Sequence, residues 1–232
     1  MSAGARELLA DLAAAGSHEL ARKARMRFRT SEKVLGVPPH AFKALLASWG
    51  RGPGGPPGTG VLEALFSSGV FEARLAAVEL AKRARRDWDV SWAELFASWA
   101  RAEDVSWRVA DAVGSDLLGP MQAKGGLPPG LLESLAESAC VWPWRAGLAA
   151  LRPGLEAGGR DWPLFEAFAR ACVGEGARFS RERAAFNGFR SALVRARRGC
   201  PAKVRDFLLR HEPELPGLLE ALEGDGAGDQ GG

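Results

Sequence analysis

Hydrophobic residues recur along almost the whole chain at spacings of three and four positions, which is the period of one face of an α-helix. No stretch of useful length alternates between hydrophobic and polar residues as a half-buried strand would. The pattern therefore predicts an all-α protein built from short helices. We expect helices at residues 4–15, 17–30, 38–49, 60–68, 70–86, 91–101, 104–119, 128–139, 142–152, 160–173, 178–198, 200–210 and 213–222.

Segments rich in glycine and proline separate the predicted helices. The three clearest breaks lie at residues 51–60, 125–130 and 152–160. Ser67, Ser91 and Ser180 are predicted N-caps, because a serine hydroxyl can accept a hydrogen bond from a free N–H of the first turn. Pro201 is predicted to lie in a first helical turn, where no N–H is needed.

The predicted helices fall into antiparallel pairs, and the pairs begin at a regular spacing. Pairs begin near residues 60, 91, 128, 160 and 200, within the range of HEAT-like repeats. We therefore predict a right-handed HEAT-like helical-repeat solenoid, an α-α superhelix, whose concave face binds the ligand. It would form one domain over residues 1–222, followed by a disordered tail at 223–232. The alternative is a compact, non-repetitive helical bundle.

The composition predicts a large hydrophobic core, and the cysteine spacing indicates a reducing compartment. Of the 232 residues, 47% are hydrophobic. Cys140, Cys172 and Cys200 are widely spaced and form no CxxC pair, which argues against a disulfide framework and against a zinc site. Glu7 and Asp11 interrupt the first apolar stretch, so it does not resemble a signal peptide. We expect a cytoplasmic protein without a metal, a cofactor or a membrane segment.

The distribution of charge is more informative than the net charge of +3, which is low for a nucleic-acid binder. Only six of the 31 basic residues are lysine; arginine binds phosphate in a bidentate fashion, although a GC-rich genome also favours arginine. Segments 22–29 and 183–205 contain no acidic residue and could clamp a duplex. The alternative is an ordinary solvated face. The candidate DNA contacts are Lys23, Arg25, Arg27, Arg183, Arg190 and Arg197.

One candidate catalytic pair lies in the segment 104–111. Trp107 and Asp111 are four residues apart, so they share one face of a helix that begins near Ser106. The alternative is a core tryptophan next to a solvated aspartate.

A candidate phosphate contact lies in the apolar segment 141–148. Pro143 suits the first turn of a helix, and Arg145 then lies near the helix N-terminus, beside Trp144. An arginine at a helix N-terminus can bind phosphate. It can also be a solvated residue or the partner of a nearby carboxylate. Most of the tryptophans in helical stretches, Trp142 among them, are expected in the core.

Four stretches resemble the HEAT-like-repeat DNA alkylation repair glycosylases, the AlkD-like family, over about residues 20–210. Two of them resemble early helix segments of that family, and two match its W-x-x-x-D and W-x-x-R-A patterns. The stretches are Leu35-Gly-Val-Pro-Pro39, residues 70–80, Ser106-Trp-Arg-Val-Ala-Asp111 and Trp142-Pro-Trp-Arg-Ala146.

The resemblance implies hydrolysis of the N-glycosidic bond of cationic N3- or N7-alkylated purines in duplex DNA, without base flipping. Asp111 falls on the catalytic carboxylate position, where it would stabilise an oxocarbenium-like transition state and position the attacking water. Trp107 would pack against the deoxyribose and contribute a cation–π interaction. Arg145, with Trp144 beside it, would contact the DNA backbone. The implied partner is double-stranded DNA containing alkylated purines. The protein is expected to bind it as a monomer and to be associated with the nucleoid.

The sequence departs from the family pattern at a second aromatic position. Where the family has another catalytic tryptophan this chain has Ser191, and a shifted alignment offers Phe189 or Phe186 instead. The region of an N-terminal aromatic used by some members holds Lys23 and Phe28. Two further hypotheses therefore stay open: a DNA-binding paralogue with little or no catalytic activity, and a helical-repeat scaffold for a protein partner.

Overall fold

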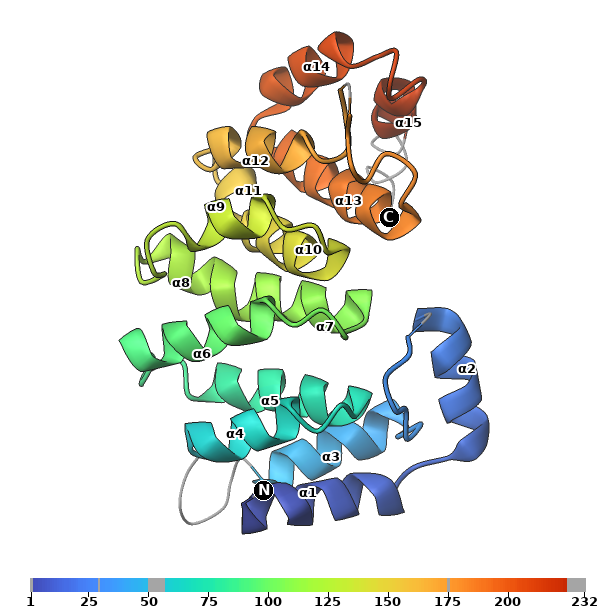
Figure 1. The fold of residues 1–232 in the computed structure, drawn as a ribbon, viewed down its shortest axis with the longest axis vertical. Coiled ribbons are helices and arrows are strands. Elements are labelled where there is room, and N and C mark those ends of the chain that lie inside the picture. Colours follow the sequence, from blue (N-terminus) through green and yellow to red (C-terminus); the bar gives the residue numbers. More distant parts are fainter. Residues whose placement is uncertain (1, 29, 50–56, 175, 225–232) are drawn as a thin grey trace, which may run out of the picture.

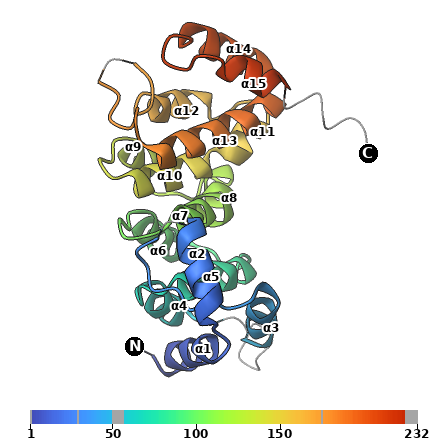
Figure 2. The ribbon, with the colours of Figure 1, turned by 90° about the vertical axis from the view of Figure 1, so that its right-hand side faces the viewer.

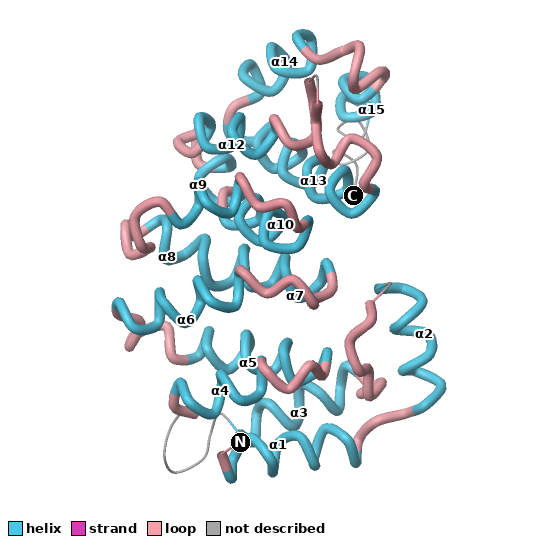
Figure 3. The backbone as a smooth tube through the Cα atoms, viewed as in Figure 1, coloured by secondary structure: helices cyan, strands magenta, loops and turns pink. Residues whose placement is uncertain are grey.

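The structure is a computed structural model, and it describes residues 2–28, 30–49, 57–174 and 176–224. Over these residues every regular element is a helix, and a single isolated bridge pairs Lys33 with Val70. The prediction of an all-α protein is confirmed (Figures 1 and 3). No helix in the described ranges is both long enough and apolar enough to cross a membrane.

The first half of the stack contains the helices that precede Asp104. These are α1 (Ala3–Ala14), α2 (His18–Phe28), α3 (Pro39–Trp49), α4 (Thr59–Phe66), α5 (Phe71–Arg83) and α6 (Val90–Ala100). The second half begins with one continuous helix of three parts, α7 (Trp107–Ala112), the π-helix η1 (Val113–Leu118) and α8 (Gly119–Ala123). The elements that follow are α9 (Leu131–Ala136), α10 (Val141–Ala150), α11 (Arg152–Glu156), α12 (Trp162–Ala169), α13 (Arg183–Gly199), α14 (Pro201–Arg210) and α15 (Leu218–Gly224).

The helices advance along the long axis of the molecule from α1 at one end to α14 and α15 at the other, with α10 below α9 and α13 below α12 within the second half (Figure 1). Helix α2 is the exception, since it runs along the stack, in front of α5 and α7 in Figure 2. The Phe28 ring at its end contacts the Phe71 ring, with centroids 4.9 Å apart. This placement brings the end of the basic segment 22–28 next to the first residues of α5 and α7, Phe71 and Trp107.

Side chains from α1 to α15 form one continuous hydrophobic core. Its largest fully buried members are aromatic and lie mainly in the second half of the stack: Trp144, Phe96, Phe165, Phe168 and Phe189. Because an aromatic side chain buries a large apolar area, these rings contribute heavily to the packing energy. The core supports the surface on which the candidate residues lie.

Several predicted boundaries are wrong. Residues 152–156 form α11 inside the break predicted at 152–160, because Pro153 fits a first helical turn. Helix α13 starts at Arg183, and the Glu182 carboxylate caps it, so Ser180 is not its N-cap. Ser67 ends α4 and the N-cap of α6 is Asp89, so the predictions for Ser67 and Ser91 fail as well.

Other boundary predictions hold or fall outside the described residues. Pro201 occupies the first turn of α14 as predicted, and residues 125–130 form the expected break between α8 and α9. Most of the break at 51–60 lies outside the described ranges. So does most of the tail predicted at 223–232, although α15 extends to Gly224.

Candidate functional site

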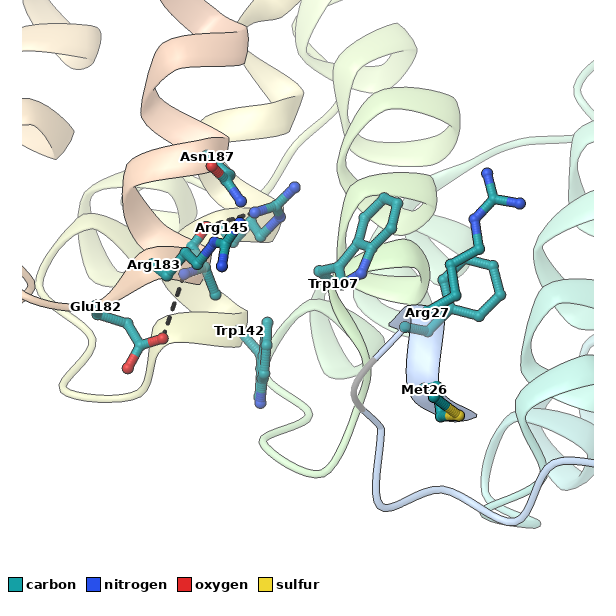
Figure 4. A pocket seen from close by; sticks show the side chains of 10 residues that line it. Met26, Arg27, Trp107, Trp142, Arg145, Glu182, Arg183 and Asn187 are labelled. Carbon is teal, nitrogen blue, oxygen red and sulfur yellow. Dashed lines mark hydrogen bonds between the residues drawn. The ribbon is translucent and has the colours of Figure 1, made fainter. Parts of the chain in front are cut away.

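A cleft of about 570 Å³ lies where the end of α2 approaches the starts of α7, α10 and α13 (Figure 4). Its walls come from four segments that are far apart in the sequence. The lining residues are Met26, Arg27, Phe28, Trp107, Trp142, Arg145, Glu182, Arg183, Ala184 and Asn187. The first turns of α7, α10 and α13 contribute to this lining, and its charged side chains are Arg27, Arg145 and Arg183 against the single carboxylate of Glu182. Three arginines against one lining carboxylate suit an anionic ligand.

The start of α7 is fixed from both sides, and this sets the position of Trp107. The Ser106 hydroxyl accepts a hydrogen bond from the N–H of Val109 at 3.4 Å, as an N-cap does. The N–H of Ser106 itself donates to the Glu32 carboxylate at 2.9 Å. Trp107 follows directly as the first residue of the helix, and Asp111 lies one turn further along.

Asp111 and Arg145 form a bidentate ion pair between α7 and α10. Arg145 Nε lies 2.7 Å from Asp111 Oδ1, and Arg145 Nη2 lies 2.9 Å from Oδ2. Arg152 adds a second cation, with its Nη2 3.3 Å from Asp111 Oδ2. The Asp111 side chain is 13% exposed, so solvent screens these interactions only weakly. Both oxygens of the candidate catalytic carboxylate are thus held by arginines.

Two glycines allow the helices that carry these charges to approach closely. A Cβ on Gly114, in η1, would lie 2.1 Å from the carbonyl oxygen of Ala146, the neighbour of Arg145. A Cβ on Gly188, in α13, would lie 3.3 Å from Arg145 Nη1. That Nη1 also donates to the carbonyl of Ala184. Arg145 is therefore clamped between α7 and α13.

Trp107 lies between the arginine of α10 and the aromatic end of α2. The Arg145 guanidinium carbon is 5.5 Å from the centroid of the Trp107 ring, which is cation–π range. The centroid of the Phe28 ring lies 5.6 Å from that of the Trp107 ring. Figure 4 shows the Trp107 indole between Arg145 and Arg27, the neighbour of Phe28 at the end of α2. The tryptophan is half-buried, so part of it remains open to a ligand in the cleft.

A buried ion pair between Arg74 and Glu32 holds the start of α7 in place. Arg74 Nη1 lies 2.9 Å from Glu32 Oε1, and the two side chains are 4% and 0% exposed. Arg74 Nη2 also pairs with the exposed carboxylate of Asp104 at 2.7 Å. Because Glu32 accepts the N–H of Ser106 as well, this pair links α5 and the segment after α2 to the position of Trp107.

Of the three residues singled out by the sequence motifs, Trp107 and Arg145 line the cleft, while Asp111 pairs with Arg145 without lining it. Arg27 and Arg183, predicted DNA contacts, also line the cleft. The other predicted basic contacts are exposed or half-buried and lie outside the cleft lining: Lys23, Arg25, Arg190 and Arg197. Lys23 pairs with Glu19 on its own helix at 2.5 Å.

Two predictions for aromatic residues are wrong. Trp144 is fully buried, and its indole N–H donates to the carbonyl of Phe168, so it cannot contact DNA. Phe189 is also fully buried, and its ring stacks on that of Phe165, so it cannot be a second aromatic of the site. Phe186 is 39% exposed but does not line the cleft.

The sequence interpretation missed several residues of the site. Trp142, expected in the core, lines the cleft in place of Trp144. A signal for this was present, because Trp142 and Arg145 are three residues apart and so share a helix face. Glu182, Asn187 and Arg152 were not singled out, and nothing in their local sequence marks them. Within the described ranges no group of histidine, cysteine and carboxylate side chains could hold a metal ion.

The model of the DNA alkylation repair enzyme family matches residues 8–220, almost the whole sequence. The chain belongs to this family. Family membership gives the protein a role in the repair of alkylated DNA and makes DNA its substrate. No curated protein matches the chain.

Proposed function

We propose that the protein is a DNA glycosylase that hydrolyses the N-glycosidic bond of N3- or N7-alkylated purines in duplex DNA. The observation that carries this proposal is that Trp107 and Arg145 line one cleft and that Asp111, which does not line it, pairs directly with Arg145, in a chain of the DNA alkylation repair enzyme family. These are the residue types that a reaction with a cationic sugar intermediate on a polyanionic substrate requires.

The chemistry follows from the charge of the damaged base. Alkylation at N3 or N7 gives the purine a positive charge, so it leaves as a neutral base when the bond to C1′ breaks and the bonding electrons stay with the nitrogen. The sugar then carries the positive charge, as in glycoside hydrolysis. Water adds to C1′ and releases a proton, which leaves an abasic site. Because the leaving group is already activated, the base need not be flipped into a pocket for protonation.

Asp111 and Trp107 would act on the cationic sugar. A carboxylate close to C1′ stabilises the developing charge and orients the attacking water. The face of the Trp107 indole, now near Arg145 at 5.5 Å, would stabilise the same cation through its π electrons. Arg27 and Arg183, at the two sides of the cleft, would contact the DNA backbone. We propose that the stacked helices form a HEAT-like superhelix whose concave face holds the duplex.

The catalytic assignment of Asp111 is tested by Asp111→Asn. Single-turnover excision from a duplex containing N3-methyladenine should fall at least about 100-fold, since one group that stabilises the transition-state charge contributes on the order of 3 kcal/mol. Duplex binding should be retained. Excision at the wild-type rate would exclude Asp111 as the catalytic carboxylate. Asp87→Asn, at an exposed site in the turn between α5 and α6, is the matched control.

A second candidate function is DNA binding without excision. The observation that favours it is that this chain has no aromatic residue available where the resembling family has its second catalytic tryptophan. Ser191, at that position, is half-buried, and Phe189 is fully buried. This alternative predicts salt-sensitive duplex binding with no release of free base from any alkylated duplex. A protein-interaction scaffold would instead show no DNA binding at moderate salt.

A further inference from the structure

Asp111 is surrounded by more positive charge than it can neutralise. Its two oxygens take three hydrogen bonds, two from Arg145 at 2.7 and 2.9 Å and one from Arg152 at 3.3 Å. Two guanidinium cations against one carboxylate leave this cluster with a net charge of +1. The side chains of Arg145 and Arg152 are 6% and 16% exposed, so solvent compensates this charge only in part. A further anion would complete the cluster.

Arg152 carries a donor that the protein itself does not satisfy. Its Nε is buried and has no acceptor among the described residues. A buried donor without a partner costs free energy that a hydrogen bond would recover. Arg152 lies two helical turns beyond Arg145, at the first residue of α11, and it reaches back to Asp111. Its position is therefore set by the carboxylate, and part of its hydrogen-bonding capacity is unused.

We propose that Arg152 extends the backbone contact expected of Arg145 into a two-arginine site for one DNA phosphate, and that Asp111 occupies this site in the free protein. The inference rests on the proposed function for the role of Asp111 in the reaction, but its phosphate site needs only DNA as the ligand. Guanidinium groups bind carboxylate and phosphate with the same fork geometry. A phosphate that enters the cluster can therefore replace the carboxylate on either arginine.

The exchange gives Arg152 a role in the reaction although it does not line the cleft. A cluster of charge +1 next to C1′ would oppose the formation of a cationic sugar. When a phosphate joins the two arginines and Asp111, the net charge falls to zero and the carboxylate regains its effect on the developing cation. The carboxylate would thus act only when the DNA backbone is in place. Arg152 is a positioning residue in this scheme, since it acts through Asp111 and the phosphate.

The test is a binding titration with an undamaged duplex, followed by fluorescence anisotropy at several salt concentrations. Asp111→Asn should bind about tenfold more tightly than the wild type, because both arginines become available for phosphate. Asp87→Asn changes the net charge by the same amount at an exposed position away from the cleft. It should leave the affinity nearly unchanged. Equal affinities of the two variants would overturn the proposal.

Arg152→Gln provides the second arm. It should weaken binding and lower the slope of log affinity against log salt by about 0.9, the value for one phosphate contact. Arg86→Gln, at an exposed position beside Asp87, is the charge-matched control and should weaken binding less. In the double variant Asp111→Asn/Arg152→Gln most of the gain should disappear. A full gain in the double variant, or equal slopes for the two arginine variants, would overturn the assignment of Arg152.

The two proposals can fail separately, because this titration uses DNA without a lesion. Tighter binding by Asp111→Asn together with no excision by the wild type would keep the phosphate site and refute the glycosylase. Excision that depends on Asp111, with no change in binding in either variant, would keep the glycosylase and refute the phosphate site. Thermal denaturation of each variant confirms that the protein compared is folded.

Discussion

The buried ion pair beneath α7 makes a specific prediction about stability. Glu32→Gln removes a carboxylate that is 0% exposed and leaves Arg74 with one charged partner, the exposed Asp104. The glutamine can still accept one hydrogen bond through its carbonyl oxygen. It cannot serve both the Arg74 guanidinium and the N–H of Ser106, which the two Glu32 oxygens accept at 2.9 Å each.

The magnitude follows from burial. Removing one partner of a buried ion pair costs about 3–5 kcal/mol, because the remaining charge stays buried. Arg74 keeps hydrogen bonds to the carbonyls of Phe66 and Asp104, so we expect about 3 kcal/mol, the lower end. For a chain of this size the melting temperature changes by about 2–4 °C per kcal/mol. The expected decrease is therefore roughly 6–12 °C.

Asp104→Asn is the matched control, since it removes the other carboxylate from the same arginine. The Asp104 side chain is 71% exposed, and an exposed ion pair contributes less than about 1 kcal/mol. Urea denaturation of both variants, followed by circular dichroism, compares the two free energies of unfolding. A loss in Glu32→Gln no larger than that in Asp104→Asn would refute the reasoning that burial makes this pair matter.

Three further predictions concern the cleft, the helix crossing and the thiols. Trp107→Leu should lower single-turnover excision roughly tenfold, the worth of about one cation–π interaction, and unchanged rates would argue against contact with the sugar. Gly114→Ala should destabilise the protein by about 2 kcal/mol or more in urea denaturation, because its Cβ would lie 2.1 Å from a carbonyl oxygen of α10; a neutral effect would mean that the crossing can open freely. Burial raises the pKa of Cys172 to about 12 and also raises the pKa of Cys200, so at pH 8 both stay protonated and unreactive. Only the partly exposed Cys140 should react with a thiol reagent in the folded protein, and rapid labelling of all three would contradict the burial.

Most helices could be predicted from the sequence because they bury one face, and that face repeats with the helical period, whereas α10 is buried at every position from Pro143 to Ala150. The wrong predictions of helix boundaries lie where one short sequence is compatible with two local structures. The Arg-Pro-Gly sequence at 152–154 looks like a break, but Pro153 and Gly154 occupy the first turn of α11, and Gly154 packs directly against Asp161. Ser180 has the side chain of an N-cap, yet Glu182 performs this role. Propensity alone does not decide between neighbouring caps.

The candidate site was predictable only where its residues share a helix. Trp107 and Asp111 are one turn apart, so their common face follows from spacing. The pairing of Asp111 with Arg145 crosses 34 residues, and the local pattern left the partner of this arginine open. Trp142 faces the cleft and Trp144 the core, and the two tryptophans, two residues apart, look equivalent in the sequence until the core fixes the phase of the helix. Arg152 enters the site through the shape of the stack, which no local pattern encodes.

The most direct test of the account is to incubate the wild-type protein with a duplex that contains a single N7-methylguanine and to measure free base by chromatography. The account predicts release of N7-methylguanine together with an abasic site in the duplex, and no release of guanine from an undamaged duplex. If the protein binds the damaged duplex but releases no base above the spontaneous rate, and does the same with N3-methyladenine, the proposed hydrolysis is wrong and the protein binds DNA without excising the base.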